Sequence, residues 1–136
     1  MKYAIIGRFQ VMQNDATGYV EPCIAHTPWG DIPSKCKGGT CYIPYGDKEH
    51  TGSNFDRISG TEGNPLILVK CKGQGVPPGA VSGYQNDGAG ILYAAIAKTQ
   101  WGLIPGKAQG NTCWFPYGGR EHATNHFSWI VKHGQH

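Results

Sequence analysis

Short apolar runs separated by turn residues form the pattern of hydrophobic and polar positions along the chain. Residues 90–96 (Gly-Ile-Leu-Tyr-Ala-Ala-Ile) and 112–117 (Thr-Cys-Trp-Phe-Pro-Tyr) are two such runs, and this length and composition are typical of strands. Residues 37–40, 85–88 and 118–122 lie between runs and contain Gly-Gly, Asn-Asp or Asp-Gly, which suit tight hairpin turns. The pattern predicts an all-β fold that is rich in hairpins.

The same pattern occurs twice. A shift of 72 residues aligns residues 7–58 with residues 79–130 without a gap, and 23 of the 52 aligned positions are identical. We therefore expect two hairpin-rich repeats, 1–60 and 61–136, related by a pseudo-twofold axis. Residues 65–70 (Pro-Leu-Ile-Leu-Val-Lys) in the joining segment read as a further strand. Because a β unit of about 60 residues is marginally stable alone, the repeats should pack as one compact β domain.

Composition and charge exclude several classes of protein. The chain has 21 glycines and 9 prolines among 136 residues, which disfavours long helices, while 39% hydrophobic residues suffice for a core. A net charge of +3 without a clustered basic run argues against nucleic-acid binding. No apolar stretch reaches the roughly 18 residues of a membrane span, and residues 1–7 are too short for a signal-peptide core. We expect a cytoplasmic protein or one released without a signal peptide.

A metal enzyme is one alternative, because Cys41 and His50 recur as Cys113 and His122. Zinc sites usually contain short Cys-x-x-Cys or His-x-x-x-His pairs, which this chain lacks, and the nearby Cys36 has no counterpart in the second repeat. We therefore expect no metal and no cofactor. The five cysteines are an odd number without a zinc spacing, which favours reduced thiols over disulfides.

Four motifs in the second repeat carry a family resemblance. They are residues 75–81 (Gly-Val-Pro-Pro-Gly-Ala-Val), 87–88 (Asp-Gly), 104–107 (Ile-Pro-Gly-Lys) and 113–122 (Cys-Trp-Phe-Pro-Tyr-Gly-Gly-Arg-Glu-His). With these motifs in this order, essentially the whole chain resembles the tandem DM-nine repeat proteins of invertebrates. The resemblance implies a protein without catalytic activity, since the family has none that is known. It implies a lectin, since the best understood members are mannose-recognising lectins that act in pattern recognition. It also implies that the partners are mannose and mannose-terminated glycans on microbial surfaces.

The resemblance further implies which residues contact the sugar. In those lectins an Asp in a turn and a Lys in the Pro-Gly-Lys segment do so, and they correspond to Asp87 and Lys107 in the second repeat and to Asp15 and Lys35 in the first. A carboxylate accepts hydrogen bonds from adjacent hydroxyls while an ammonium donates to neighbouring oxygens, so each pair is a minimal sugar clamp. The residues alone leave open that the aspartates only serve turns and that the lysines are solvated.

Six more repeated residues are candidates to support the sugar site: Asn14, Asn86, Trp29, Trp101, Glu49 and Glu121. A tryptophan ring can stack on the apolar face of a sugar, but a repeated tryptophan also fits a core. The asparagine amides can bond the ligand or serve the backbone of a tight turn. The glutamates, each followed by a histidine, can line the site or cap the turns that precede them.

Functions of other classes compete with that of a mannose-specific lectin with two sugar sites per chain. Glycoside hydrolysis needs two carboxylates flanking one bond, and only two acidic positions repeat, so a hydrolase is disfavoured. A non-catalytic protein-interaction module of an immune response is the alternative function. We expect a homodimer, although no sequence feature marks its interface.

Overall fold

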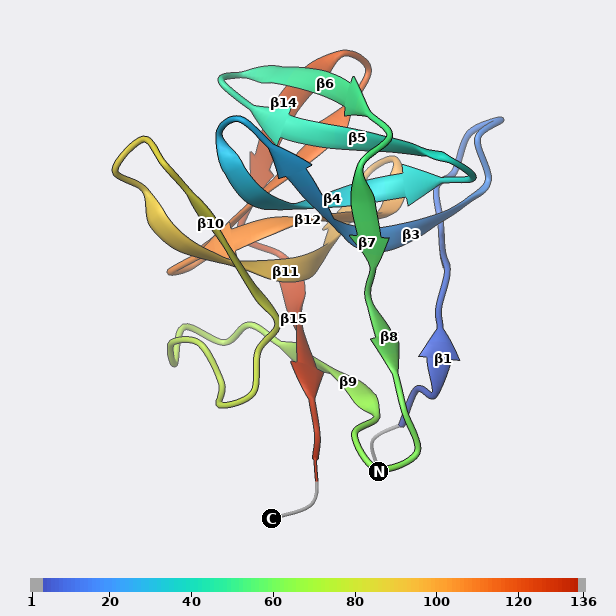
Figure 1. Cartoon of the computed structure of the whole chain (residues 1–136), viewed down its shortest axis with the longest axis vertical. Coiled ribbons are helices and arrows are strands. Elements are labelled where there is room, and N and C mark those ends of the chain that lie inside the picture. The colour runs from blue at the N-terminus through green and yellow to red at the C-terminus, as the bar shows by residue number, and fades with distance from the viewer. Residues whose placement is uncertain (1–3, 135–136) are drawn as a thin grey trace.

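The computed structural model describes residues 4–134 (Figure 1), so the outer ends of the two predicted repeats, residues 1–3 and 135–136, lie outside the described residues. Within residues 4–134 the chain forms fifteen strands and no helix, and hence no helix that could cross a membrane. The strands are β1 (Gly7–Arg8), β2 (Val11–Met12), β3 (Tyr19–Thr27), β4 (Gly30–Lys37), β5 (Thr40–Tyr45), β6 (Lys48–Gly52), β7 (Phe55–Arg57), β8 (Ser59–Gly60), β9 (Leu66–Lys70), β10 (Ser82–Gln85), β11 (Gly90–Thr99), β12 (Gly102–Gln109), β13 (Thr112–Tyr117), β14 (Arg120–Thr124) and β15 (Phe127–Lys132).

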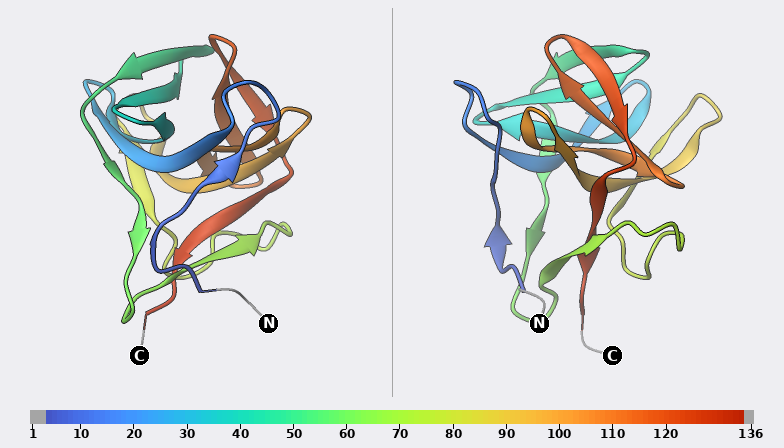
Figure 2. Two further views of the ribbon diagram at one scale, coloured as in Figure 1. Left: turned by 90° about the vertical axis from the view of Figure 1, so that its right-hand side faces the viewer. Right: turned by 180° about the vertical axis from the view of Figure 1, so that it is seen from behind.

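Thirteen of the strands belong to one curled sheet, which confirms the all-β prediction. Neighbouring strands follow the order β2-β3-β4-β5-β6-β14-β13-β12-β11-β15-β9, with β7 added to β3 and β10 added to β11. β1 and β8 form a separate two-stranded sheet. Figure 2 shows the hairpins β5–β6 and β13–β14 side by side at the end of the molecule opposite β1, β8 and the end of β15. The two hairpin tips therefore meet.

Strand pairing in one half recurs in the other with residue numbers 72 higher. Ile24 pairs with Pro33 across β3 and β4, and Ile96 pairs with Pro105 across β11 and β12. The pairs between β4 and β5, between β5 and β6 and between β3 and β7 recur in the same way. The halves differ beside the equivalent strands β7 and β15. β15 pairs with β9, whereas among the described residues β7 has no neighbour in the position of β9. The pseudo-twofold axis and the boundary after residue 60 stay predictions.

Both halves of the chain contribute to the core. One buried cluster lies in each half, around Ile32 in the first and Trp129 in the second. A third cluster joins Val20 of β3 to Leu66 of β9 and Ile130 of β15, all of which are almost fully buried. Because burial of apolar surface is the main stabilising term and this cluster draws on both halves, the chain forms one compact domain, as predicted.

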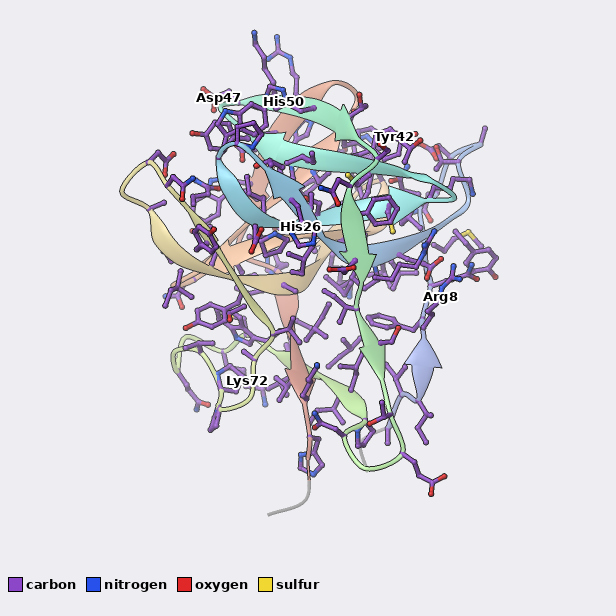
Figure 3. The ribbon with its side chains drawn as sticks, in the orientation of Figure 1. Arg8, His26, Tyr42, Asp47, His50 and Lys72 are labelled. Carbon is purple, nitrogen blue, oxygen red and sulfur yellow. The ribbon has the colours of Figure 1, made fainter. Side chains whose placement is uncertain are left out.

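The hairpin tips are joined by reciprocal hydrogen bonds. The Glu49 backbone N–H donates to Gly119 O at 3.0 Å, and the Glu121 N–H donates to Asp47 O at 3.2 Å. The same glutamates also accept through their side chains, Glu49 Oε1 from the Gly119 N–H at 2.9 Å and Glu121 Oε1 from the Asp47 N–H at 3.1 Å. Figure 3 shows Asp47 and His50 together at this end of the molecule. Each tip is therefore held by a glutamate of the other half.

Candidate ligand-binding sites

A cavity of about 300 Å³, the first pocket, contains the first predicted pair, Asp15 and Lys35. The turn between β2 and β3, strands β4 to β6 and the turn between β13 and β14 build it. Its lining residues are Gln13, Asp15, Thr17, Lys35, Tyr42, Glu49, Tyr117 and Gly118. A volume near 300 Å³ is at the small end of ligand pockets, which suits a ligand of monosaccharide size.

A cavity of about 340 Å³, the second pocket, contains the second predicted pair, Asp87 and Lys107. Its lining residues are Tyr45, Gly46, Gln85, Asp87, Ala89, Leu92, Lys107, Gln109, Trp114 and Glu121. Eight of these are the 72-residue counterparts of the eight residues that line the first pocket. Leu92 and Gln109 are additional, and Trp114 stands where the first pocket has Tyr42. The two pockets therefore share a polar set and differ in their aromatic wall.

Each pocket includes a tyrosine from the other half of the chain. The Tyr117 hydroxyl of β13 donates to Asp15 Oδ2 at 2.9 Å, and Tyr45 of β5 lines the second pocket. Trp101 stacks on Tyr117 with ring centroids 4.4 Å apart, and Trp29 stacks on Tyr45 at 4.6 Å. The two predicted tryptophans are half-buried and lie behind the tyrosines, outside the pocket linings. They hold the tyrosine rings in place.

The Asp15 carboxylate is held by its own turn and by Tyr117. The Thr17 N–H donates to Oδ1 at 2.9 Å, which is the side-chain turn that aspartate commonly forms, and Gln13 Nε2 lies 3.2 Å from both carboxylate oxygens. The Tyr117 hydroxyl, and after it the Thr17 amide, lowers the pKa of Asp15 below its ordinary value. The carboxylate is therefore ionised and able to accept further hydrogen bonds.

Asp87 has the same local arrangement. The Ala89 N–H donates to Oδ1 at 3.1 Å, and Gln85 Nε2 lies 3.2 Å from both oxygens. These bonds, the Ala89 amide first, lower the pKa of Asp87. The two aspartates thus serve their turns and also face the pockets.

The lysines are buried rather than solvated, with 5% of Lys35 and 4% of Lys107 exposed. Lys35 Nζ donates to Gln13 Oε1 at 2.7 Å and to Pro116 O at 2.9 Å, and Glu49 Oε2 lies 3.6 Å away. Burial lowers the pKa of Lys35, and Glu49 opposes that shift.

Lys107 Nζ donates to Gln85 Oε1 and lies 3.0 Å from Glu121 Oε2. Burial likewise lowers the pKa of Lys107, and Glu121 opposes it. In each half the repeated glutamate therefore lines the pocket and also joins the hairpin tips.

A glutamine connects the two members of each predicted pair. Gln13 places its amide nitrogen beside Asp15 and accepts from Lys35 through its amide oxygen, and Gln85 does the same in the second pocket. Among the described residues no ion pair joins Asp15 directly to Lys35. Each pocket thus has an anionic acceptor and a cationic donor in one lining. Gln13 and Gln85 are aligned by the 72-residue shift but were not among the predicted site residues.

Asn14 and Asn86 lie outside both pockets. Their backbone N–H groups donate to Trp101 O and Trp29 O, each at 2.8 Å, and Asn86 Nδ2 donates to Pro28 O at 3.2 Å. The asparagines therefore join the two halves through the backbone rather than facing a pocket.

The histidines that follow the glutamates, His50 and His122, contact Tyr45 O and Tyr117 O through Nε2 at 2.9 Å and lie against the tryptophan rings. They support the tyrosine turns. Across residues 4–134, no three His, Cys, Asp or Glu side chains gather in a way that could hold a metal ion.

A comparison with protein-family models supports the DM9 part of the family resemblance. The family model of the DM9 repeat matches residues 28–124, more than two thirds of the chain, and this segment includes Lys35 and the second predicted pair. No curated protein is detectably similar to the chain. The DM9 repeat family is a family of binding modules rather than of enzymes, consistent with a carbohydrate-binding or immune-related role. The chain belongs to the DM9 repeat family.

Proposed function

We propose that this protein is a mannose-specific lectin with one sugar site in each pocket, and that it acts as a pattern-recognition protein for mannose-terminated glycans on microbial surfaces. The observation that carries the proposal is the recurrence of one polar set, Asp, Gln, Lys, Glu and Tyr, in two pockets of a single chain. The four residues of the two predicted pairs, Asp15, Lys35, Asp87 and Lys107, would make the sugar contacts.

The separation of charge inside each pocket suits neighbouring hydroxyls of a hexose. The carboxylate of Asp15 or Asp87 would accept from one or two hydroxyls, and the ammonium of Lys35 or Lys107 would donate to an oxygen beside them. The ring of Tyr42 or Trp114 offers apolar surface for the C–H groups of the sugar. A few such contacts on an open surface correspond to a dissociation constant near 1 mM, or about 4 kcal/mol.

Binding should not require calcium. Calcium takes about six to eight oxygen ligands, whereas each pocket brings a lysine ammonium next to its carboxylates. We therefore expect the affinity for mannose to be the same with and without a chelator. A loss of binding in the chelator that calcium restores would show that the lysine clamp is the wrong description.

Isothermal titration calorimetry with mannose and a high-mannose glycan, and with galactose as the control sugar, tests the proposal. We expect heat with the first two and none with galactose. Asp15→Asn combined with Asp87→Asn should abolish the heat, while Asp47→Asn, which removes a charge outside both pockets, should not. No heat with any sugar, together with no signal on a glycan array, would reject the lectin in favour of a protein-interaction module.

A further inference from the structure

A third cavity of about 340 Å³ lies over strands β9, β15, β11 and β12 and shares no residue with the first or second pocket. Three of its lining side chains carry basic groups, Lys70, Lys98 and His126, and three are aliphatic, Leu68, Ile96 and Leu103. Both lysines are exposed. No aspartate or glutamate lines this cavity, which we call the basic pocket.

Strand register places these side chains on one face of the sheet. Ser128 of β15 pairs with Lys70 of β9 on one side and with Ile96 of β11 on the other. Lys98, two residues after Ile96, pairs with Leu103 of β12. Directly paired residues project from the same face, and so do residues two apart on a strand. Lys70 and Lys98 therefore flank an apolar floor.

The equivalent face of the first half is neutralised internally. His26, Asp31 and Asp56 are the 72-residue counterparts of Lys98, Leu103 and Ser128. Nδ1 of His26 lies 2.9 Å from Asp31 and its Nε2 lies 2.8 Å from Asp56, and the bond with Asp31, then that with Asp56, raises the pKa of His26. Figure 3 shows His26 near β7, and among the described residues β7 pairs only with β3, because β1 pairs with β8 alone.

In the second half both aspartates are replaced by uncharged residues, whereas a basic residue, Lys98, stands in place of His26. Leu103 and Ser128 stand in place of the two aspartates, and β9 adds Lys70 to the wall. Among the described residues no ion pair includes Lys70, Lys98 or His126. Uncompensated cations beside exposed apolar surface attract a ligand that brings both an anionic group and an apolar body.

We propose that the basic pocket binds a small organic anion. Lys70 and Lys98 hold the oxyanion of this ligand, and Leu68, Ile96 and Leu103 contact its apolar body. This binding activity is separate from the proposed sugar sites and does not depend on them, because the two sets of residues do not overlap.

The probes are benzoate and phenyl phosphate, with benzyl alcohol as the neutral control and inorganic phosphate as the control without an apolar body. Amide NMR titration should show saturable shifts at β9, β15 and β11 with the first two probes only. Alkylation of Cys71 gives a second readout, because Cys71 lines the basic pocket and the other four cysteines are buried. Benzoate should slow that alkylation. Equal binding of benzyl alcohol, or equal binding of inorganic phosphate, would overturn the proposal.

Two sets of variants locate the anion. Lys98→Met and Lys70→Met should each weaken benzoate binding about tenfold, the typical value of a hydrogen bond to a charged group. Lys72→Met removes the same charge from an exposed neighbour outside the pocket and should leave the affinity unchanged. Unchanged affinity in both Lys98→Met and Lys70→Met would overturn the proposal.

The combined variant Lys98→His, Leu103→Asp and Ser128→Asp transfers the first-half arrangement to the second half and should abolish benzoate binding. Sedimentation velocity on the same variant tests whether this face is instead an interface between copies of the chain. A change in oligomeric state without any benzoate binding in the unmodified chain would make the face an interface between copies, and would overturn the organic-anion site.

Discussion

Asp15 and Lys35 show how a few bonds prepare single side chains for a ligand. Hydrogen bonds lower the pKa of the aspartate, so its carboxylate is ionised at acidities where an ordinary aspartate begins to protonate. Burial lowers the pKa of the lysine, so its ammonium is lost at a less alkaline pH than that of an ordinary lysine, about 10.4. The same two directions hold for Asp87 and Lys107. The lowered aspartate and lysine pKa values together set the pH range in which both groups are charged and can bind a sugar.

We predict a pH profile of mannose affinity that is flat at acid pH and falls at alkaline pH. The aspartates stay ionised at acidities where an ordinary aspartate begins to protonate, because hydrogen bonds lower their pKa values. The alkaline fall should begin below the usual lysine pKa of about 10.4, because burial lowers the lysine pKa values. Calorimetry in a series of buffers of constant ionic strength measures the profile. A loss of affinity between about pH 7 and pH 5 would assign the binding to a histidine and contradict the clamp.

Tyr117→Phe should weaken the first pocket, although Tyr117 belongs to the second half of the chain. It removes the 2.9 Å bond to Asp15, and a hydrogen bond to a charged group is typically worth a factor of about ten in affinity. In an Asp87→Asn background the remaining mannose affinity should fall, and in an Asp15→Asn background it should not change. Tyr19→Phe, an exposed tyrosine outside both pockets, is the control. The reverse pattern would show that the tyrosine serves its own half.

At the scale of strands and turns, close packing between the halves rests on glycines at the β3–β4 and β11–β12 turns. A Cβ at Gly102 would lie 2.6 Å from Met12 O and 2.9 Å from the Asn14 nitrogen, and the residue has a φ of +99°. Gly110 also has a positive φ, of +62°, but a Cβ there would meet nothing within 4 Å. The two positions separate the cost of steric overlap from the cost of the backbone conformation.

Gly102→Ala should therefore destabilise the fold more than Gly110→Ala does. The second change costs about 1–2 kcal/mol for a left-handed backbone, and overlap with the Met12 carbonyl adds about 1–3 kcal/mol to the first. Urea denaturation with unchanged m-values measures both differences. Equal losses of stability would mean that the halves separate easily at this contact.

Much of the strand arrangement was predictable from the sequence, whereas the residues that each pocket takes from the other half of the chain were not. Residues 112–117 were predicted as a strand and form β13, and the predicted run 65–70 contains β9 (Leu66–Lys70). Hydrophobic pattern and turn residues are local signals, so they identify strands well. Tyr117 reaches Asp15 only because the hairpin tips meet, and a contact between residues 102 apart leaves no local pattern.

At the scale of the whole molecule, two pockets on one chain matter because weak sites gain strength together. When one pocket holds a glycan, binding by the other becomes intramolecular, so the apparent affinity for a surface exceeds that of either site. We propose that the protein forms a homodimer, which would present four pockets.

Agglutination tests this multivalency. Mannan-coated beads should aggregate with the protein, and free mannose at tens of millimolar, well above the expected dissociation constant of about 1 mM, should reverse the aggregation. Asp87→Asn should leave weaker agglutination, because a dimer of one-site chains is still bivalent. Sedimentation velocity should give about twice the chain mass of 14.7 kDa. If the protein is a monomer that agglutinates only with both pockets intact, the homodimer is wrong and the claim of two sugar sites per chain stands.

The most direct test of the two-site account is an amide NMR titration of the unmodified chain and of Asp87→Asn with mannose. In the unmodified chain, signals around Thr17 in the first pocket and around Ala89 in the second should both shift and saturate. In Asp87→Asn only the signals around Thr17 should still respond, and adding Asp15→Asn should remove that response. If Asp87→Asn alone abolishes every shift, or if only one pocket responds in the unmodified chain, the claim of two sugar sites per chain is wrong.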